Sequence, residues 1–534
     1  MNASPRLSLA ECAGQQWDLI VIGGGITGAA VLREAARVGL KCLLLEQRDF
    51  AWGASSRSGK WVHGGLRYIK QGQFKVTWHS VQEREKLCRE LPGLIQLKAM
   101  QWPLFKGKWQ ASALIHAGLR LYEWMAGTRR RHAADLKQMA LDFPYLQAVG
   151  LKGAVCFYEG QTDDARLTLR VLQEARQCGA QALNYAEVTQ LLKQPHSGAV
   201  CGVKVQRQGS AELHEIHARQ VIAATGAWAD RLRQQVRHNP HEHLRPLRGS
   251  HLLFSAERLP IHSTLVLEHP RDRRPGFITL FQGRVMLGNT DIDHRADLQG
   301  EAAISPEEVD YLLENIRHHF PALNITRTDV LSSFAGVRPV VDSGQADPSK
   351  ESREHVLWHE DELISIGGGK LTTFQHIAIA ALRLAQHKFP GVSFDPGQPL
   401  LATAPPAVVL PAQLDVQQGQ QLLGRYGAAV APMLAQASSA SLQQIAGTQT
   451  LWCELAWCAA HEDVQHLDDL LLRRTRIGLL LEQGGLSLLA NIRTLVQEIL
   501  GWSDAHWQLE VERYCQLWRT HYSVPDAAVD EASR

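Results

Sequence analysis

The sequence predicts an α/β fold with a doubly wound, Rossmann-like nucleotide-binding domain, an interleaved domain built on a mixed β-sheet, and a C-terminal all-helical domain. Three observations predict this fold. Residues 18–46 follow the order strand, glycine turn, helix, strand. Short strand-like runs recur between residues 151 and 366, and from Gln413 onward the pattern is almost wholly helical, with the clearest helical period at 451–474. Strands that alternate with helices are typical of a parallel sheet, whereas a separate run of helices is typical of a domain of its own.

The length of the chain supports more than one domain. Its 534 residues exceed what one hydrophobic core normally serves. A stretch rich in Pro and Ala at 396–411 has the composition of a linker. We therefore predict a nucleotide-binding domain with the interleaved domain over residues 1–405 and a helical domain over residues 406–534.

The first glycine turn carries the nucleotide-binding signal. After the strand, Gly23, Gly25 and Gly28 give GxGxxG. The first glycine permits the tight turn, the second lets the backbone approach a pyrophosphate, and the third lets the helix pack on the sheet. Glu46 ends the second strand 18 residues beyond Gly28, where a carboxylate can accept hydrogen bonds from an adenosine ribose. No Lys-Ser/Thr follows the turn, which excludes a phosphate loop of the NTPase type.

Composition narrows the possible partners. The net charge is +2 and no long basic stripe occurs, so no nucleic-acid partner is predicted. The nine cysteines form no CxxC pair, and the chain has no HExxH or GxSxG. The sequence therefore predicts no metal site, no disulfide framework and no hydrolase site, and it indicates a reducing compartment. No run of about 18 apolar residues occurs, so no membrane span is predicted.

Two further glycine turns follow predicted strands, at Thr225-Gly226 and at Gly367–Gly369. In a doubly wound sheet such turns gather at the carboxyl edge, where ligands bind. The last turn opens a helix at Leu371, whose free N–H groups could stabilise negative charge on a bound ring or phosphate. One such turn alone would indicate only a tight connection, whereas the ordered set favours a bound cofactor.

Cationic side chains lie beside these turns and in the Ser-rich loop that follows Glu46. They are Lys60, His63, Arg67, Arg248, His251, Arg338, Arg353 and Lys370. Two arginines that converge on one pocket would suit a phosphate or carboxylate, because the guanidinium fork matches those oxygens. His63 and His251 are candidate general bases, since imidazole titrates near neutrality. Each of these residues could also be a surface, capping or structural side chain.

The stretch 102–125 is amphipathic and rich in Trp. Its apolar residues fit one helical face, flanked by Trp102, Trp109 and Trp124 and followed by Arg129–Arg131. Such a segment could lie in a bilayer interface. It could equally be a helix packed on the core of the protein, followed by a solvated basic loop.

A set of ordered motifs resembles the FAD-dependent glycerol-3-phosphate dehydrogenases, within the wider group of D-amino-acid-oxidase-like flavoproteins. The Ser-rich loop that ends in HGGLRY is the most specific of them. The matching motifs are DLIVIGGGITGAA (18–30), GASSRSGKWVHGGLRYI (53–69), QTDDARLTL (161–169), PLRGSHLLF (246–254), LGNTDID (287–293), FAGVRPVV (334–341), SREHVL (352–357), ISIGGGKLTTF (364–374) and ELAWCAAHEDVQHLDDLLLRRTRIG (454–478).

The resemblance implies noncovalently bound FAD. Its contacts would come from Gly23, Gly25, Gly28, Glu46, Ser55, Ser56, Thr225, Gly226, Gly367, Gly368, Lys370, Leu371 and Thr372. It also implies oxidation of sn-glycerol 3-phosphate at C2 to dihydroxyacetone phosphate, with the electrons passed from the flavin to a membrane quinone.

The same resemblance implies a substrate pocket. Its residues would be Arg67, Tyr68, His251, Thr290, Arg338, Arg353 and Lys370. We assign Arg338 and Arg353 to the phosphate because of their fork geometry. Lys370 and Thr290 would lie nearer the reacting hydroxyl, and the proton acceptor would be His251 first and His63 second.

The sequence also departs from the family pattern. Gly59 and Trp61 replace the usual Ser and Leu before HGGLRY, and Asn289 replaces Thr in the GTTD segment. Thr27 and Ala227 replace the usual Asn and Pro. An enzyme of the same fold could therefore act on another hydroxy acid or an amine, or use oxygen as acceptor. A non-catalytic FAD-bound scaffold and an RNA-associated flavoprotein are further alternatives.

The resemblance also implies a cytoplasmic protein, peripheral on the inner face of the cell membrane. A quinone acceptor favours membrane-surface attachment through residues 102–131. The role of the helical tail stays open between packing, partner docking and formation of a homodimer.

Overall fold

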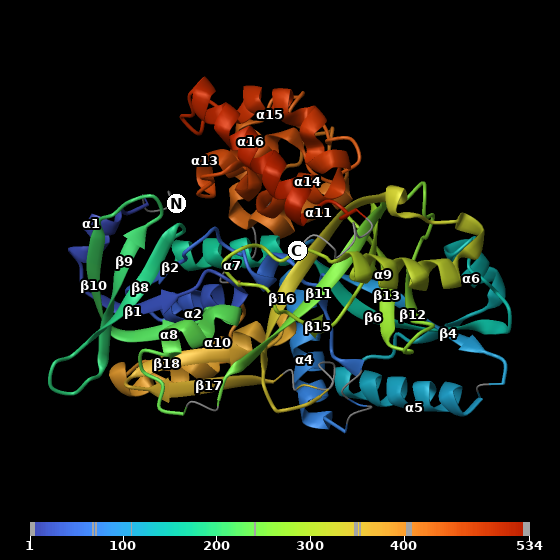
Figure 1. Cartoon of the computed structure of the whole chain (residues 1–534), viewed down its shortest axis with the longest axis horizontal. Helices are drawn as coiled ribbons and strands as arrows, with labels where there is room; N and C mark the ends of the chain where they lie inside the picture. The colour runs from blue at the N-terminus through green and yellow to red at the C-terminus, as the bar shows by residue number, and fades with distance from the viewer. Residues whose placement is uncertain are drawn as a thin grey trace, which may run out of the picture.

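The computed structural model describes residues 6–66, 69, 72–107, 109–239, 242–346, 351, 354–401 and 408–526. Two β-sheets lie side by side, and a helical lobe formed by the C-terminal part of the chain covers one side of both (Figure 1). Three of the predicted site residues, Arg67, Tyr68 and Arg353, lie outside the described residues. The predicted fold class, an α/β fold with a mixed second sheet and a helical C-terminal part, is confirmed.

The first sheet is the predicted nucleotide-binding sheet, with strand order β17-β18-β10-β1-β2-β7. Its strands are β1 (Trp17–Ile22), β2 (Cys42–Leu45), β7 (Gln181–Leu183), β10 (Leu213–Ala223), β17 (His355–Glu360) and β18 (Leu363–Gly368), extended by β8 (Ala186–Lys193) and β9 (Val200–Arg207). The pairs β1–β2, β1–β10, β10–β18 and β2–β7 are parallel, so their carboxyl ends share one edge.

Both faces of this sheet are covered. Leu19 and Val21 of β1 pack into one core with α2 (Ile26–Arg37), α7 (Asp164–Gln177) and α10 (Phe374–Leu384). Ile20 and Ile22 pack into a second core with α1 (Leu9–Ala13), β8, β9 and the region of α8 (Ala229–Arg233). Successive side chains of a strand point to opposite faces, so a strand that is buried on both faces is apolar throughout. Residues 19–22 of β1 follow this rule, since all four are apolar and buried.

The second sheet has the order β15-β11-β14-β13-β12-β4-β6-β3, with β16 paired to β11 and β5 paired to β6. Its strands are β3 (Trp61–Val62), β4 (Ile95–Phe105), β5 (His132–Ala134), β6 (Leu151–Thr162), β11 (Leu244–Ser255), β12 (Thr264–Glu268), β13 (Pro275–Phe281), β14 (Arg284–Gly288), β15 (Ile292–Asp293) and β16 (Val330–Val341). The β4–β12 pair is parallel and its neighbours are antiparallel, so the sheet is mixed as predicted. The helices α4 (Phe74–Glu90), α5 (Trp109–Ala126), α6 (Leu136–Asp142) and α9 (Pro306–His319) belong to this half (Figure 1).

The C-terminal lobe contains α11 (Val416–Tyr426), α12 (Val430–Gln436), α13 (Trp452–His461), α14 (Ile477–Leu480), α15 (Leu489–Val496) and α16 (Asp504–His521). Its apolar core is continuous with Phe281, Met286 and Phe334 of the second sheet. The predicted domain boundary at 405/406 lies outside the described residues, so the division into 1–405 and 406–534 stays a prediction.

Two sequence-based predictions of long helices were wrong in detail. Residues 102–105 belong to β4, because they pair with β6, and the helix begins only at Trp109. The periodic segment 451–474 is broken: α13 ends at His461, and a π-helical turn then covers Asp469–Arg474. All six residues of that turn are buried, although three of them are charged.

No helix among the described residues is long and apolar enough to cross a membrane.

Candidate active site

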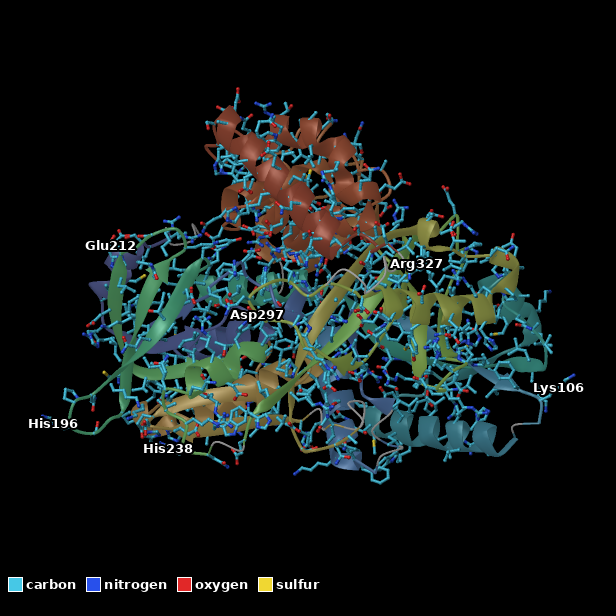
Figure 2. The ribbon with its side chains drawn as sticks, viewed as in Figure 1. Lys106, His196, Glu212, His238, Asp297 and Arg327 are labelled. Atoms are coloured by element: carbon cyan, nitrogen blue, oxygen red, sulfur yellow. The ribbon has the colours of Figure 1, made fainter. Side chains whose placement is uncertain are left out.

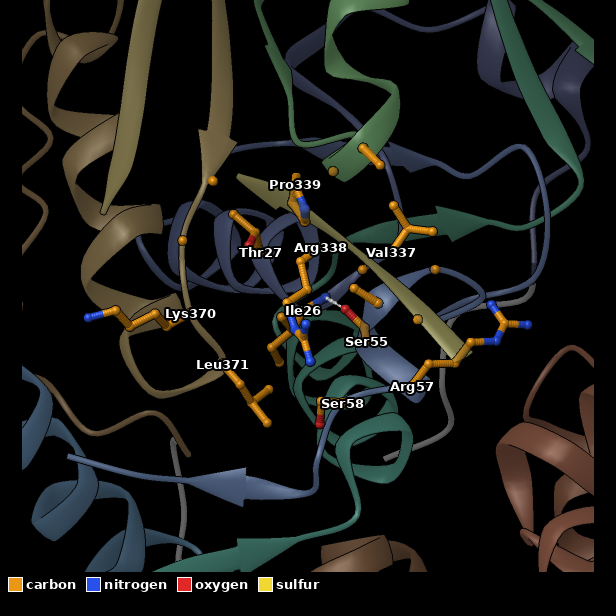
Figure 3. Close-up of a pocket in the computed structure, with 18 of the residues that line it drawn as sticks. Ile26, Thr27, Ser55, Arg57, Ser58, Val337, Arg338, Pro339, Lys370 and Leu371 are labelled. Carbon is orange, nitrogen blue, oxygen red and sulfur yellow. Dashed lines mark hydrogen bonds between the residues drawn. The ribbon is translucent and has the colours of Figure 1, made fainter. Parts of the chain in front are cut away.

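A cavity of about 540 Å³ lies at the carboxyl edge of the first sheet (Figure 3). Gly23 after β1, Glu46 after β2, Thr225 after β10 and Gly368 at the end of β18 line it. His251 of β11 and Arg338 of β16 line it from the second sheet. The three predicted glycine turns therefore meet at one edge, and the second sheet closes the cavity over them.

The first turn has the geometry of a phosphate cradle. Gly23 has φ 107°, and a Cβ there would lie 2.5 Å from the Ala224 carbonyl oxygen. A Cβ on Gly25 would lie 3.0 Å from the Ser55 hydroxyl. Gly25, at the N-cap of α2, has no side chain to cap the helix, and Ser55 Oγ from the loop accepts a hydrogen bond from Ile26 N at 2.9 Å. The positive end of this helix therefore faces the cavity and suits a pyrophosphate.

Gly28 and Gly367 have a packing role in this structure, and Ser56 is buried. A Cβ on Gly28 would lie 1.9 Å from the Gly23 carbonyl oxygen, so only glycine lets α2 approach β1. A Cβ on Gly367 would lie 2.4 Å from the Trp358 ring. None of the three lines the cavity, although each was predicted to contact the cofactor.

Glu46, which was predicted to bind an adenosine ribose, and Thr225 both line the cavity. Glu46 accepts hydrogen bonds from Gly24 N at 2.6 Å and from Arg48 N at 2.8 Å, and its burial raises the pKa of its carboxyl. Each carboxylate oxygen has further lone pairs that can accept from ribose hydroxyls. Thr225 Oγ1 is buried and has no hydrogen-bond partner among the described residues. An orphaned hydroxyl in the wall of a cavity fits a bound polar ligand.

The opposite wall is the turn before α10. Lys370, Leu371 and Thr372 line the cavity, and Thr372 Oγ1 bridges the His63 backbone, accepting from its N–H at 3.1 Å and donating to its C=O at 3.0 Å. In Figure 3 the Lys370 side chain extends away from Arg338. The residues of both walls together fit a dinucleotide that spans the edge of the sheet.

His251 is buried against the far end of this cavity. Its side chain is 1% exposed, and its ring stacks on Phe334 with centroids 4.6 Å apart. Neither ring nitrogen has a hydrogen-bond partner among the described residues. Burial, and then the charges of Arg338 and Lys60, lower the pKa of His251 well below 6.5, so its ring is neutral at pH 7.

Arg338 is one of the cationic residues that line the cavity. Its Nη1 donates to Asp291 Oδ1 at 2.9 Å, and its side chain projects into the middle of the lining residues (Figure 3). Asp291 lines the same cavity. A guanidinium carries five N–H donors in a fixed fork, a geometry that matches the oxygens of an anionic ligand.

Two other predicted residues, Thr290 and His63, lie in different surroundings from His251 and Arg338. The Thr290 hydroxyl lies outside the cavity lining, where it donates to Glu308 Oε1 at 2.6 Å and accepts from Ser250 N at 2.9 Å. His63 lines the cavity but is exposed. Sequence reasoning missed Asp291, although it follows Thr290 in the motif LGNTDID. It also missed Phe334, whose stacking on His251 no local pattern reveals.

The departures from the family pattern face the cavity. Gly59, Trp61 and Asn289 all line it. A Cβ on Gly59 would lie 3.0 Å from the Phe277 ring and 3.4 Å from His251 Nε2. The Trp61 ring packs edge-to-face on the same Phe277, with centroids 5.8 Å apart. Gly59 thus leaves space beside Phe277 in the aromatic wall of the cavity. The large side chain of Trp61 extends the same wall.

Lys60 lies behind that wall. It is fully buried, and its Nζ donates to Asp164 Oδ1 at 2.8 Å and lies 4.7 Å from the centroid of Phe334. Burial lowers the pKa of Lys60 to about 8, and the charge of Arg476 adds to this effect, whereas Asp164 opposes it.

Comparison with protein families identifies both parts of the chain. Residues 18–382 match the family described as FAD dependent oxidoreductase, and residues 365–507 match the C-terminal domain of alpha-glycerophosphate oxidase. The aerobic glycerol-3-phosphate dehydrogenase of Bacillus subtilis is 36% identical over 374 residues, covering 69% of this chain and 67% of the relative. That of Staphylococcus saprophyticus is 30% identical over 485 residues, covering 86% and 87%.

A solved structure supports the same conclusion. The glycerol-3-phosphate dehydrogenase of Bacillus halodurans complexed with FAD has a TM-score of 0.73 and 26% identity, covering 95% of this chain and 96% of that one. The L-alpha-glycerophosphate oxidase of Mycoplasma pneumoniae, at 17% identity and a TM-score of 0.57 over 72% of this chain and 98% of that one, shares the fold. The cofactor that fits the cavity is therefore FAD. The chain belongs to the FAD-dependent oxidoreductase family, in the branch of the glycerol-3-phosphate dehydrogenases.

Proposed function

We propose that the protein oxidises sn-glycerol 3-phosphate at C2 to dihydroxyacetone phosphate and passes the electrons to a membrane quinone. The observation that carries the proposal is that the neutral His251 and the cationic Arg338 share one cavity with most of the predicted FAD contacts, and that the ring nitrogens of His251 have no hydrogen-bond partner among the described residues. The names of relatives at 30–36% identity support the same substrate.

In this proposal each residue of the cavity has a physical task. Arg338, with Arg353, binds the phosphate through its forked N–H donors. His251 accepts the proton of the C2 hydroxyl, because a neutral imidazole is ready to act as a base. Bound FAD would supply the redox chemistry, as acceptor of the C2 hydride and donor of electrons to the quinone.

The remaining predicted residues complete the proposal. Arg67, Tyr68 and Lys370 would border the substrate, and His63 is the second choice for the base. Thr290 would act through Glu308 and Ser250, to which its hydroxyl is bonded. For the cofactor we propose direct contact with Gly23, Gly25, Glu46, Ser55, Thr225, Gly226, Gly368, Lys370, Leu371 and Thr372, and a supporting role for Gly28, Ser56 and Gly367.

Anaerobic absorbance spectroscopy tests the proposed reaction. Glycerol 3-phosphate should bleach the flavin band of the purified protein, whereas glycerol and lactate should not. A flavin band that glycerol 3-phosphate leaves unchanged would contradict the substrate. Reoxidation of the bleached enzyme by oxygen faster than by a soluble quinone would contradict the acceptor and favour an oxidase.

Replacing Arg338 with alanine should raise KM for glycerol 3-phosphate about 10–100-fold, because hydrogen bonds to a charged group contribute about 1.5–3 kcal/mol. FAD should stay bound. Arg245→Ala is the matched control: Arg245 pairs with Asp293 at 2.6 Å, as Arg338 pairs with Asp291, but it lies outside the cavity lining. Equal KM values for both variants would remove Arg338 from the phosphate site.

We further propose that the protein attaches to a membrane surface through α4 and α5. Trp78 of α4 and Trp124 of α5 contact each other edge-to-face at 5.5 Å, and both are exposed. Leu114 is 66% exposed and Trp124 68%. The exposed Arg129 and Arg130 follow the helix, and Lys106 precedes it at one end of the molecule (Figure 2). The opposite face of α5 packs on the core of the protein through Leu119 and Tyr122, so only the exposed face is proposed to contact the membrane.

Vesicle binding tests this surface. The double variant Leu114→Ala/Trp124→Ala should bind vesicles of phosphatidylglycerol and phosphatidylcholine at least about tenfold more weakly, because each buried side chain contributes about 1.5–3 kcal/mol. Leu509→Ala is the control, since Leu509 is 63% exposed on α16 of the other lobe. Equal sedimentation of both variants with vesicles would contradict the proposal.

A further inference from the structure

Charged residues of the C-terminal lobe enter the nucleotide-binding half of the molecule. Arg473, Arg474 and Arg476 are each at most 2% exposed, and each pairs with a carboxylate of the other half. Arg473 and Arg474 both bond to Asp49, the former at 2.5 Å and the latter at 2.6 Å. Buried charges require such partners, so the lobe and the nucleotide-binding half cannot separate without a large electrostatic cost.

Arg476 differs from the other two because it reaches the Ser-rich loop, residues 53–60. This loop contributes Gly53, Ser55, Arg57, Ser58 and Gly59, among others, to the cavity lining. Arg476 Nη1 donates to the Ser56 carbonyl oxygen at 3.1 Å, and its Nη2 donates to Asp163 Oδ1 at 2.8 Å and to Asp164 Oδ1 at 2.5 Å.

Asp164 also bonds directly to loop 53–60. Asp164 Oδ2 accepts from Ser58 N at 2.8 Å, and Asp164 Oδ1 accepts from Lys60 Nζ at 2.8 Å. Lys60 Nζ also donates to the Ser56 carbonyl oxygen at 2.7 Å. Arg476 and Asp164 thus hold three groups of the loop: the carbonyl of Ser56, the amide of Ser58 and the side chain of Lys60.

A second contact joins the lobe to the loop. Arg57, which lines the cavity, donates from Nη2 to the Tyr522 hydroxyl at 2.9 Å. Arg476 itself has φ 60°, a left-handed conformation that a non-glycine residue adopts only where its surroundings enforce it. The enforcing contacts here are the loop and the two aspartates.

We propose that Arg476 is a positioning residue: it fixes the Ser-rich loop 53–60 in the conformation that receives FAD, so that the C-terminal lobe completes the cofactor site. The lobe is then part of the catalytic unit rather than an appended module. This inference needs FAD as the cofactor and is independent of the substrate proposed above.

The experiment compares Arg476→Gln and Arg476→Lys with Arg474→Gln in the full-length protein. Arg474 is the matched control because it is equally buried in the same docking network but makes no bond to loop 53–60 among the described residues. The measurements are the FAD dissociation constant of the apoprotein, the visible circular dichroism of the bound flavin, and the thermal unfolding midpoint.

We expect Arg476→Gln to weaken FAD binding at least about tenfold, as the loss of a charge-assisted hydrogen bond implies, and to change the visible circular dichroism. Arg474→Gln should lower the unfolding midpoint but leave the FAD dissociation constant within about twofold and the flavin spectrum unchanged. Arg476→Lys keeps the charge but not the fork, so it should fold, and should restore FAD affinity only in part.

Two results would overturn the inference. In one, Arg476→Lys binds FAD with the wild-type constant and spectrum. In the other, the Arg474→Gln and Arg476→Gln variants change the flavin spectrum equally. That result would show that Arg476 only helps to dock the C-terminal lobe, as Arg474 does. Neither result depends on turnover, so the failure of glycerol 3-phosphate as substrate would not affect them.

Discussion

Replacing His251 with asparagine should lower kcat for glycerol 3-phosphate by about 10²–10⁴-fold, the usual contribution of a positioned general base, while FAD stays bound. The expectation follows from two properties of this ring. Its two nitrogens have no hydrogen-bond partner among the described residues, although it is almost completely buried. Buried polar atoms are normally paired, so a ring in this state is suited to a ligand that enters the cavity.

His269→Asn is the control for this prediction. His269 is also 1% exposed and also stacked on an aromatic ring, that of Tyr311 at 3.7 Å. Both of its nitrogens are engaged, however: Nε2 donates to the Tyr311 carbonyl oxygen and Nδ1 accepts from Arg271 N. His269→Asn should therefore reduce stability and leave kcat near the wild-type value. A similar fall of kcat in both variants would show that His251 only supports the fold.

The pH dependence follows from the same environment. Burial and the charges of Arg338 and Lys60 disfavour the imidazolium, so the pKa of His251 lies well below 6.5. A base acts in its deprotonated form, so kcat should be constant through pH 6.5 and fall only at more acidic pH. An inflection of kcat at or above pH 6.5 would contradict His251 as the base and direct attention to the exposed His63.

The sequence predicts a structural feature of this protein best when the feature depends on residues that lie close together in the chain. The turn at Gly23–Gly28 and the strand that ends at Glu46 are set by residues within one βαβ unit, and the structure has them where the sequence places them. The convergence of His251, Arg338 and the turn before α10 is not a local property. It was predicted only through the order of the family motifs, and pairing of β11 with β16 brings the two side chains into one cavity.

The docking network could not be predicted at all, because its partners are remote in sequence. Asp49 and Arg473 are 424 positions apart. The periodicity of 451–474 predicts one regular helix, yet Asp468 and Asp469 must face Arg473 while Arg474 reaches Asp49. A π-helical turn at Asp469–Arg474 accommodates these ion pairs. The tertiary ion pairs thereby override the local preference for a regular α-helix.

Replacing Asp49 with asparagine should destabilise the protein by about 3–5 kcal/mol, the usual cost of removing one partner from a buried ion pair. Asp49 is fully buried and accepts from Arg473 Nε and from both terminal nitrogens of Arg474. An amide keeps the volume but loses the charge, so two guanidinium groups are left buried with less compensation. The measurements are the thermal unfolding midpoint and the proteolytic release of the C-terminal lobe.

Asp18→Asn is the control, because Asp18 pairs with a half-exposed Arg219 at 3.1 Å in the same sheet. Exposed pairs contribute about 0–1 kcal/mol, so this variant should unfold close to the wild-type midpoint. If Asp49→Asn behaved like Asp18→Asn, the arginines would have found other compensation in Asp468 and Asp469, and the network would be redundant rather than essential for docking.

Acid should weaken the contact between the C-terminal lobe and the nucleotide-binding half of the molecule. Burial alone would raise the pKa of Asp49, but Arg474 and Arg473 outweigh it and hold this pKa below its usual value. Arg476 likewise outweighs burial and lowers the pKa of Asp163 to about 2. A carboxyl with a depressed folded-state pKa stabilises the fold above its unfolded pKa of about 3.9, and this stabilisation is lost as the pH falls toward the folded value. Wild-type protein should therefore lose its C-terminal lobe to proteolysis between about pH 4 and pH 2. Asp49→Asn should do so at a higher pH than the wild type, because one of the stabilising carboxylates is already absent.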